Sequence, residues 1–222
     1  MRRRWPPSTR KVRVNIGIIG SGKIGATVGG LWAKAGHNVM FSSRHPEKLD
    51  PLVAKVGSNA RRGTPEEAAK FGESLLISIP FAALPALGQE LASFLVGKVA
   101  LETGNPYPER DGPMAQEVRD SSRGSGVFTQ QYLTGAIVVR AFNSVNDVAL
   151  AAAAHRAGER IGIPLASDSE EALELAAQLV RDAGFEPVVL GPLGMSRFFD
   201  VGSPAYNKAL PVQELRPLLG IG

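Results

Sequence analysis

Short apolar runs alternate along the chain with longer segments of helical periodicity. The helical segments are predicted at 26–35, 46–56, 65–71, 84–95, 145–156 and 169–183. The short runs are rich in branched residues, as in strands buried on both faces, and are predicted at 13–19, 37–41, 75–79, 98–101, 136–141, 160–165 and 187–190. This alternation predicts an α/β fold with a doubly wound, mostly parallel sheet and helices on both faces.

The remaining segments show no such pattern. Residues 102–112 are rich in Gly and Pro and are expected to form a loop, and a polar stretch follows up to Gly126. Residues 191–222 suggest short helices and loops that serve as an acceptor or dimer segment. No linker divides the chain, so we expect one domain over 13–222 after a basic, disordered tail at 1–12.

A glycine turn follows the first predicted strand. It has the form Gly20-x-Gly22-x-x-Gly25 and leads into a helix that Gly36 would cap. In this fingerprint the first glycine permits a tight turn, the second lets the backbone approach a pyrophosphate, and the third lets helix and strand pack closely. The turn therefore predicts a Rossmann-type dinucleotide site; its members are Gly20, Ser21, Gly22, Lys23, Ile24 and Gly25.

The end of the second strand indicates which dinucleotide binds. NAD enzymes place an acid there for the ribose 2′-OH, whereas this chain has hydroxyl and cationic groups. A guanidinium meets phosphate oxygens in bidentate fashion, so the pattern favours NADP(H) over NAD(H), although the same group could be a solvated surface cluster. The predicted 2′-phosphate site consists of Ser42, Ser43, Arg44 and Lys48.

Three later turns are expected to line the rest of the crevice. Ligands of open α/β sheets bind outside the carboxyl ends of the strands, where these turns lie. In each turn, the Asn and Pro residues could instead serve only to form the turn itself. The residues predicted to contact the coenzyme here are Ile79, Pro80, Phe81, Asn105, Pro106, Phe142 and Asn143.

Composition adds exclusions rather than a function. The chain is 44% hydrophobic and 21% charged, as globular proteins are. Its net charge of +4 belongs to the tail, since six of 25 basic residues lie in 1–13 and leave 19 against 21 acids. We therefore expect no nucleic-acid partner. There is no long apolar run and no signal sequence, so a cytoplasmic protein without a membrane partner is expected; the arginines at 2–4 lack the apolar stretch of an export signal.

Side-chain chemistry is sparse. The chain has no cysteine and only three scattered histidines, so neither a metal site nor a thiol nucleophile is expected, and no catalytic residue can be assigned.

Six motifs follow one another along the chain: GIIGSGKIG, VMFSSRHPEK, SIPF, TGNPYP, VRAFNSV and VLGPLGMSR. In these motifs the chain resembles the NADPH-dependent coenzyme F-420 oxidoreductases, whose nucleotide domain is shared with the STEAP metalloreductases. The resemblance implies that Ser43, Arg44 and Lys48 bind the 2′-phosphate and that the turns at Ile79, Asn105 and Phe142 surround the nicotinamide. It also implies hydride transfer between NADP(H) and a deazaflavin or flavin acceptor, such as coenzyme F-420, with little help from side chains.

Two other functions stay open at this point. One is reduction of a small carbonyl or imine, although the segment after Leu190 is too short for the all-helical domain of such enzymes. The other is a sensor or scaffold that binds NADP(H) without turning it over. A homodimer is expected on general grounds, since most soluble oligomers are symmetric homo-oligomers.

Overall fold

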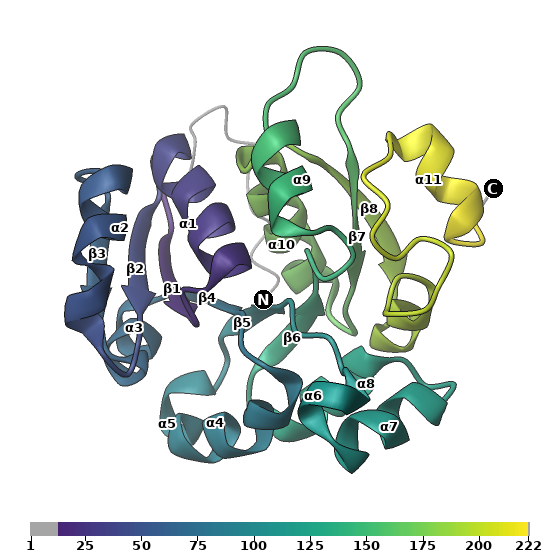
Figure 1. Cartoon of the computed structure of the whole chain (residues 1–222), viewed down its shortest axis with the longest axis horizontal. Helices are drawn as coiled ribbons and strands as arrows, with labels where there is room; N and C mark the ends of the chain where they lie inside the picture. The colour runs from purple at the N-terminus through teal and green to yellow at the C-terminus, as the bar shows by residue number, and fades with distance from the viewer. Residues whose placement is uncertain (1–12, 222) are drawn as a thin grey trace, which may run out of the picture.

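The computed structural model describes residues 13–221. Segment 1–12, and with it the predicted basic tail, lies outside the described residues. Eight strands form one sheet in the order β3-β2-β1-β4-β5-β6-β7-β8 (Figure 1). They are β1 (Asn15–Ile19), β2 (Asn38–Ser42), β3 (Ala60–Gly63), β4 (Ser74–Ile77), β5 (Val99–Glu102), β6 (Ile137–Arg140), β7 (Gly162–Ala166) and β8 (Glu186–Gly191).

The sheet is parallel from β3 to β6 and reverses once. β7 meets β6 in antiparallel fashion through a single register pair, Arg140 with Ala166, and β8 then runs parallel to β7. The predicted doubly wound, mostly parallel sheet is confirmed. The reversal was not predicted, because strand periodicity carries no information on direction.

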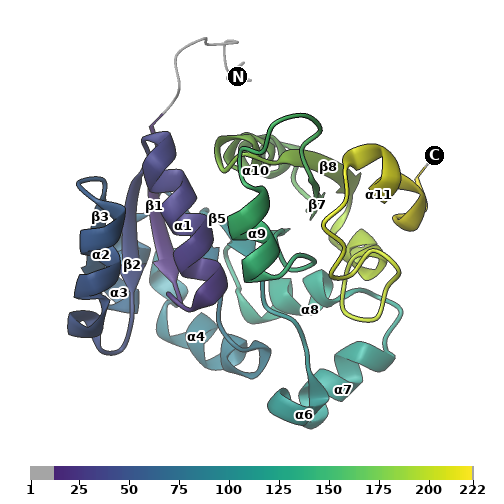
Figure 2. The same ribbon diagram turned by 45° about the horizontal axis from the view of Figure 1, so that its top comes forward.

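Helices cover both faces of the sheet (Figures 1 and 2). The first apolar core packs residues of the strands against one helix layer, and a second core lies on the opposite face. The first layer contains α1 (Lys23–Ala35), α2 (Asp50–Val56), α9 (Asp147–Ala153) and α10 (Glu170–Asp182). The second contains α3 (Pro65–Phe71), α4 (Leu84–Glu90), α5 (Ala92–Leu95), α7 (Pro113–Asp120) and α8 (Ser125–Tyr132), with α6 (Pro108–Asp111) next to α7.

The segment after β8 packs on the end of the sheet. It contains the 3₁₀ helix η3 (Leu193–Phe198) and α11 (Val212–Leu218). Four buried residues of this segment form a third apolar cluster with Ala166 of β7 and Val188 of β8; they are Phe199, Ala205, Leu215 and Leu219. Two further 3₁₀ helices are η1 (Pro46–Leu49) and η2 (Phe81–Ala83). Figure 2 shows this C-terminal segment, in yellow, beside β7 and β8.

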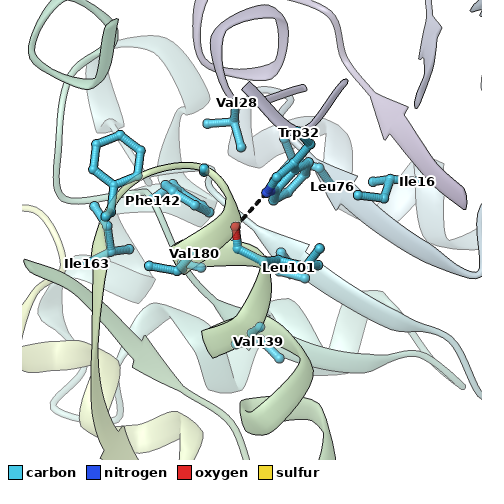
Figure 3. Packing of buried hydrophobic residues seen from close by; sticks show 14 of the residues in the cluster. Ile16, Val28, Trp32, Leu76, Leu101, Val139, Phe142, Ile163 and Val180 are labelled. Carbon is cyan, nitrogen blue, oxygen red and sulfur yellow. Dashed lines mark hydrogen bonds between the residues drawn. The ribbon is translucent and has the colours of Figure 1, made fainter. Parts of the chain in front are cut away.

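Trp32 connects α1 to α10 within the first helix layer. Its side chain is completely buried in α1, and its indole N–H donates to the carbonyl of Leu179 in α10 at 2.7 Å (Figure 3). Its ring also meets the ring of Phe142 edge to face, with centroids 6.0 Å apart. Because Phe142 follows β6, this packing holds the turn after β6 at a fixed place beside α1.

Several elements differ from the sequence-based expectation. The polar stretch up to Gly126 contains α7 and the first residues of α8, and the expected loop at 102–112 contains α6. α7 buries only Ala115 and Val118, so its apolar stripe is too narrow to be read from the sequence. The edge strand β3 was not predicted because two exposed arginines, Arg61 and Arg62, occupy its centre. The predicted helix cap at Gly36 is confirmed, with φ at 103°.

Candidate functional site

Two glycines of the turn between β1 and α1 are required by the protein's own packing. Gly20 has a φ of +93°, and a Cβ there would lie 2.3 Å from the carbonyl oxygen of Ser78. A Cβ on Gly25 would lie 2.1 Å from the carbonyl oxygen of Gly20. These two positions therefore accept only glycine, whether or not a ligand is bound.

Gly22 is different, because neither its backbone conformation nor its packing requires a glycine at this position. Its φ of −71° is open to any residue, and a Cβ there would meet no atom within 4 Å. Gly22 is also the N-cap of α1, and no side chain caps that helix end. Free backbone N–H groups and the helix dipole favour an anion at this point. The open space over Gly22 thus fits a pyrophosphate that approaches the backbone closely.

The cationic group lies next to this turn. The hydroxyl of Ser21 donates to the carbonyl oxygen of Ser42 at 3.1 Å, which joins the glycine turn to the end of β2. Arg44 and Lys48 follow at the surface, and neither forms an ion pair with another described residue. Ser43 is partly exposed, and its hydroxyl accepts the backbone N–H of His45 at 3.0 Å.

Ser42 has a structural partner. Its side chain is 1% exposed, and its hydroxyl donates to the carbonyl oxygen of Ile18 at 2.7 Å. It therefore links β2 to β1 below the surface on which the other three predicted 2′-phosphate residues lie.

A cavity of about 330 Å³ opens on the other side of the glycine turn. One wall comes from the end of the turn, a second from the loop after β5, a third from the segment after β6, and a fourth from the C-terminal segment. The lining residues are Ile24, Thr103, Asn105, Tyr107, Phe142, Asn143, Ser144, Val145, Asn146, Asp147, Tyr206 and Asn207.

The turn after β6 has an unusual backbone. Phe142 has a φ of 59°, which non-glycine residues seldom adopt, and its ring is anchored by edge contacts with Trp32 and Phe185. The next residue, Asn143, accepts at its backbone oxygen a hydrogen bond of 2.8 Å from the side-chain amide of Asn105. The two predicted asparagines are thus brought together at the cavity, and each fixes the other's loop.

A buried charge network lies beneath the cavity. The Arg140 guanidinium is completely buried and bonds the carboxylate of Glu102, the carbonyl oxygen of Gly104 at 2.8 Å and the carboxylate of Asp200 at 3.0 Å. Asp200 also accepts the backbone N–H and the hydroxyl of Ser125. One cation therefore holds together the ends of β5 and β6, the start of α8 and the C-terminal segment.

The network shifts the titration of its members. Burial raises the pKa of Glu102 and outweighs the opposite effect of the Arg140 charge. Burial lowers the pKa of Arg140, but the two carboxylates outweigh burial, so its pKa is raised overall. Arg140 is consequently a permanent cation.

The C-terminal segment closes the cavity through two polar contacts. The hydroxyls of Tyr206 and Tyr107 are hydrogen-bonded to each other. The side-chain amide of Asn146 donates to the side-chain oxygen of Asn207 at 2.9 Å. Burial, followed by the hydrogen bond to Tyr107, raises the pKa of Tyr206, so the hydroxyl of Tyr206 stays protonated.

The predicted crevice residues divide into two groups. Asn105, Phe142 and Asn143 line the cavity, together with Ile24 of the glycine turn, whereas four of the predicted crevice residues do not: Ile79, Pro80, Phe81 and Pro106. Phe81 is completely buried in the second core and packs edge to face on Tyr132. Ile79 instead crowds Gly20, since a Cβ on that glycine would lie 2.8 Å from its Cγ2. Whether these side chains contact a coenzyme stays a prediction.

Sequence reasoning missed part of the lining. Tyr107 directly follows the Asn105-Pro106 turn, so an aromatic at the carboxyl end of a strand was a usable signal. Tyr206 and Asn207 reach the cavity only through tertiary packing of the C-terminal segment, for which no local pattern exists.

Other site types find no support in residues 13–221. No group of three or more His, Asp or Glu side chains in this part of the chain could hold a metal ion. Over the same range, no helix is both long and apolar enough for a bilayer crossing. His37 is buried at the start of β2, where its ring lies 3.2 Å from the carboxylate of Asp182.

A comparison with protein families finds one model that matches the N-terminal part of the chain, which contains the glycine turn. Residues 15–106 match the family model for "NADP oxidoreductase coenzyme F420-dependent". The chain is 26% identical over 216 residues to metalloreductase STEAP3 of Rattus norvegicus; the match covers 93% of this chain but spans only 39% of that relative's length.

Two solved structures show the same fold. A hypothetical protein from Sinorhizobium meliloti superposes with a TM-score of 0.79 at 22% identity, covering 89% of this chain and 95% of that one. A protein from Arthrobacter sp. FB24, named an F420-dependent NADP reductase, superposes with a TM-score of 0.70 at 21% identity, covering 83% and 87%. At these identities the likeness concerns the fold alone.

Proposed function

We propose that the chain transfers hydride between NADP(H) and a deazaflavin or flavin ring, because its residues 15–106 match the family model for "NADP oxidoreductase coenzyme F420-dependent". The observation that carries the coenzyme part is Gly22, whose open Cβ position and uncapped helix end suit a diphosphate and have no role in the folded protein alone.

Three parts of the site bind three parts of the coenzyme. The backbone of the glycine turn holds the pyrophosphate, and Ser43, Arg44 and Lys48 hold the 2′-phosphate on the β2 side. The cavity on the β5 and β6 side takes the nicotinamide end and the electron acceptor. Bound NADPH supplies the hydride.

The cavity lining supports an acceptor that needs orientation rather than acid or base catalysis. Its polar side chains are amides, hydroxyls and the carboxylate of Asp147, with no histidine or lysine among the lining residues. The raised pKa of Tyr206 keeps that hydroxyl protonated, so it serves as a hydrogen-bond donor and is a poor proton source. A planar ring held by such donors accepts hydride without a side chain that must gain or lose a proton.

Replacing Gly22 with alanine tests the coenzyme site. NADP⁺ affinity should fall by at least about tenfold, because the new methyl group occupies the space of the pyrophosphate. The free energy of unfolding should change by less than about 1 kcal/mol, since the methyl group meets no protein atom. Calorimetric titration and chemical denaturation measure the two quantities. Gly25→Ala is the control, and it should lose stability as well as affinity; an unchanged affinity in Gly22→Ala would refute the placement of the pyrophosphate.

A panel of acceptors tests the reaction. Purified protein with NADPH should oxidise it, seen as loss of NADPH absorbance, when coenzyme F-420, FMN or FAD is added. Turnover with a cyclic imine in place of these rings would support reduction of a small substrate. Tight NADPH binding without turnover on any of them, a ferric chelate included, would contradict the proposal and favour a sensor.

A further inference from the structure

One polar atom at the cavity lacks a partner. Asn143 lines the cavity with only 5% of its surface exposed, and its side-chain oxygen, Oδ1, is buried without a hydrogen bond to any described residue. Buried acceptors in folded proteins are nearly always hydrogen-bonded. This oxygen can therefore accept a hydrogen bond from a ligand.

The orientation of the amide follows from its other contacts. The nitrogen, Nδ2, lies 3.2 Å from the carbonyl oxygen of Phe199 and 3.4 Å from carboxylate Oδ1 of Asp200 and from Oδ1 of Asn105. All three atoms are acceptors, so exchanging the nitrogen and oxygen of Asn143 would set oxygen against oxygen. Oδ1 is thus the amide atom that has no hydrogen-bond partner among the described residues.

The sheet order determines which part of the coenzyme comes near this oxygen. β2, with the cationic group at its end, lies on one side of β1, and β4, β5 and β6 lie on the other. A dinucleotide whose pyrophosphate sits over Gly22 and whose 2′-phosphate lies at Arg44 must extend its other half towards β5 and β6. Ile24, at the end of the glycine turn, already lines the cavity that contains Asn143.

We propose that Asn143 Oδ1 accepts a hydrogen bond from the carboxamide NH₂ of the nicotinamide ring and so determines how that ring is oriented. This rests on the proposed NADP(H) site. The ring itself carries no N–H or O–H, and its carboxamide is the donor group attached to it. Because the terminal torsion of an asparagine is soft, the proposal requires only that the amide rotate to present this oxygen to the ring.

The proposal gives the C-terminal segment a role in coenzyme recognition. Phe199 and Asp200 hold the amide nitrogen of Asn143, and Asp200 is itself held by the buried Arg140. Asn143 is therefore the residue through which the C-terminal segment acts on the nicotinamide.

Three ligands separate this contact from the rest of the site. NADP⁺ has the carboxamide; its 3-acetylpyridine analogue has a methyl ketone, which cannot donate; adenosine 2′,5′-bisphosphate lacks the nicotinamide half altogether. Calorimetric titration of the full chain should show that NADP⁺ binds about tenfold more tightly than the analogue, the loss expected when a buried acceptor is left unpaired. Equal affinities for the two dinucleotides in the unmodified protein would overturn the proposal without any variant.

Substitution then assigns the preference to one side chain. Asn143→Ala should bind both dinucleotides within about twofold of each other and keep its affinity for adenosine 2′,5′-bisphosphate. Asn143→Ser, whose hydroxyl is too short to reach the same point, should behave alike and replaces the alanine variant if that one does not fold. Lys34→Ala is the control, because Lys34 is exposed in the last turn of α1, at the end opposite the glycine turn; it should keep the tenfold preference.

The outcomes are distinct. A preference that persists in both Asn143 variants overturns the role of this residue while leaving the coenzyme site intact. Failure of the unmodified protein to bind adenosine 2′,5′-bisphosphate overturns the proposed coenzyme site, and the present proposal with it.

Discussion

Arg140→Met should lower the free energy of unfolding by about 3–5 kcal/mol, the range for removing one partner of a buried ion pair. The change leaves the carboxylate of Glu102 completely buried and that of Asp200 nearly so, both without their cation. Methionine fills much of the same volume, so the loss measures charge rather than a cavity. Chemical denaturation near neutral pH gives the value.

The loss should depend on pH in a stated direction. In the folded protein the pKa of Glu102 is raised by burial above its unfolded value, so its contribution to stability is fully present below the unfolded pKa and is lost as pH rises through the folded pKa. Removing Arg140 takes away the group that opposes this rise. The difference between variant and unmodified protein should therefore grow from acidic to neutral pH.

Arg62→Met is the matched control. Arg62 pairs with Asp50 at the surface, where the two side chains are 41% and 61% exposed, and such pairs contribute about 0–1 kcal/mol. If Arg140→Met were as mild as this control, the buried network would not be what holds the cavity walls together.

Arg44→Asp should weaken NADPH binding by about 1.5–3 kcal/mol, or roughly 10- to 150-fold, as expected for the loss of a charged phosphate contact. NADH has no 2′-phosphate, so its affinity should change far less. The free energy of unfolding should be unaffected, because Arg44 is exposed and forms no ion pair with another described residue. Titration with both coenzymes at one ionic strength measures the difference.

Lys34→Asp controls for the change in net charge. Lys34 is exposed in the last turn of α1, at the end opposite the glycine turn, so the same charge reversal there should leave the ratio of NADPH to NADH affinity unchanged. If Arg44→Asp lost equal affinity for NADPH and NADH, the proposed binding of the 2′-phosphate at this part of the surface would be refuted.

The parts of the site that were predictable are those whose chemistry is local. Gly20, Gly22 and Gly25 lie in one turn between a strand and a helix, so their spacing alone indicates a phosphate cradle. Arg44 is predicted to bind the 2′-phosphate because the end of β2 is two residues away in sequence; this role stays a prediction. Phe142 and Asn143 were placed by the general rule that ligands bind at the carboxyl ends of strands.

The parts that were not predictable depend on contacts between distant segments. Asp200 reaches Arg140 across 60 residues, and Tyr206 reaches Tyr107 across 99. Neither contact leaves a periodic trace in the sequence. Phe81 was predicted at the crevice from its position after a strand; the structure buries its ring in the second core, and its contact with a coenzyme stays a prediction.

The cavity wall formed by the C-terminal segment is far in sequence from the residues proposed to bind the phosphates. The anchors proposed for the phosphates lie before residue 49, whereas Tyr206 and Asn207 belong to a segment held mainly by its own apolar cluster and by Asp200. Under the proposed function, substitutions along 201–210 should change which oxidant fits while the proposed phosphate anchors stay in place. Exchanging that stretch between homologues is then expected to give proteins that share a coenzyme and differ in what they reduce.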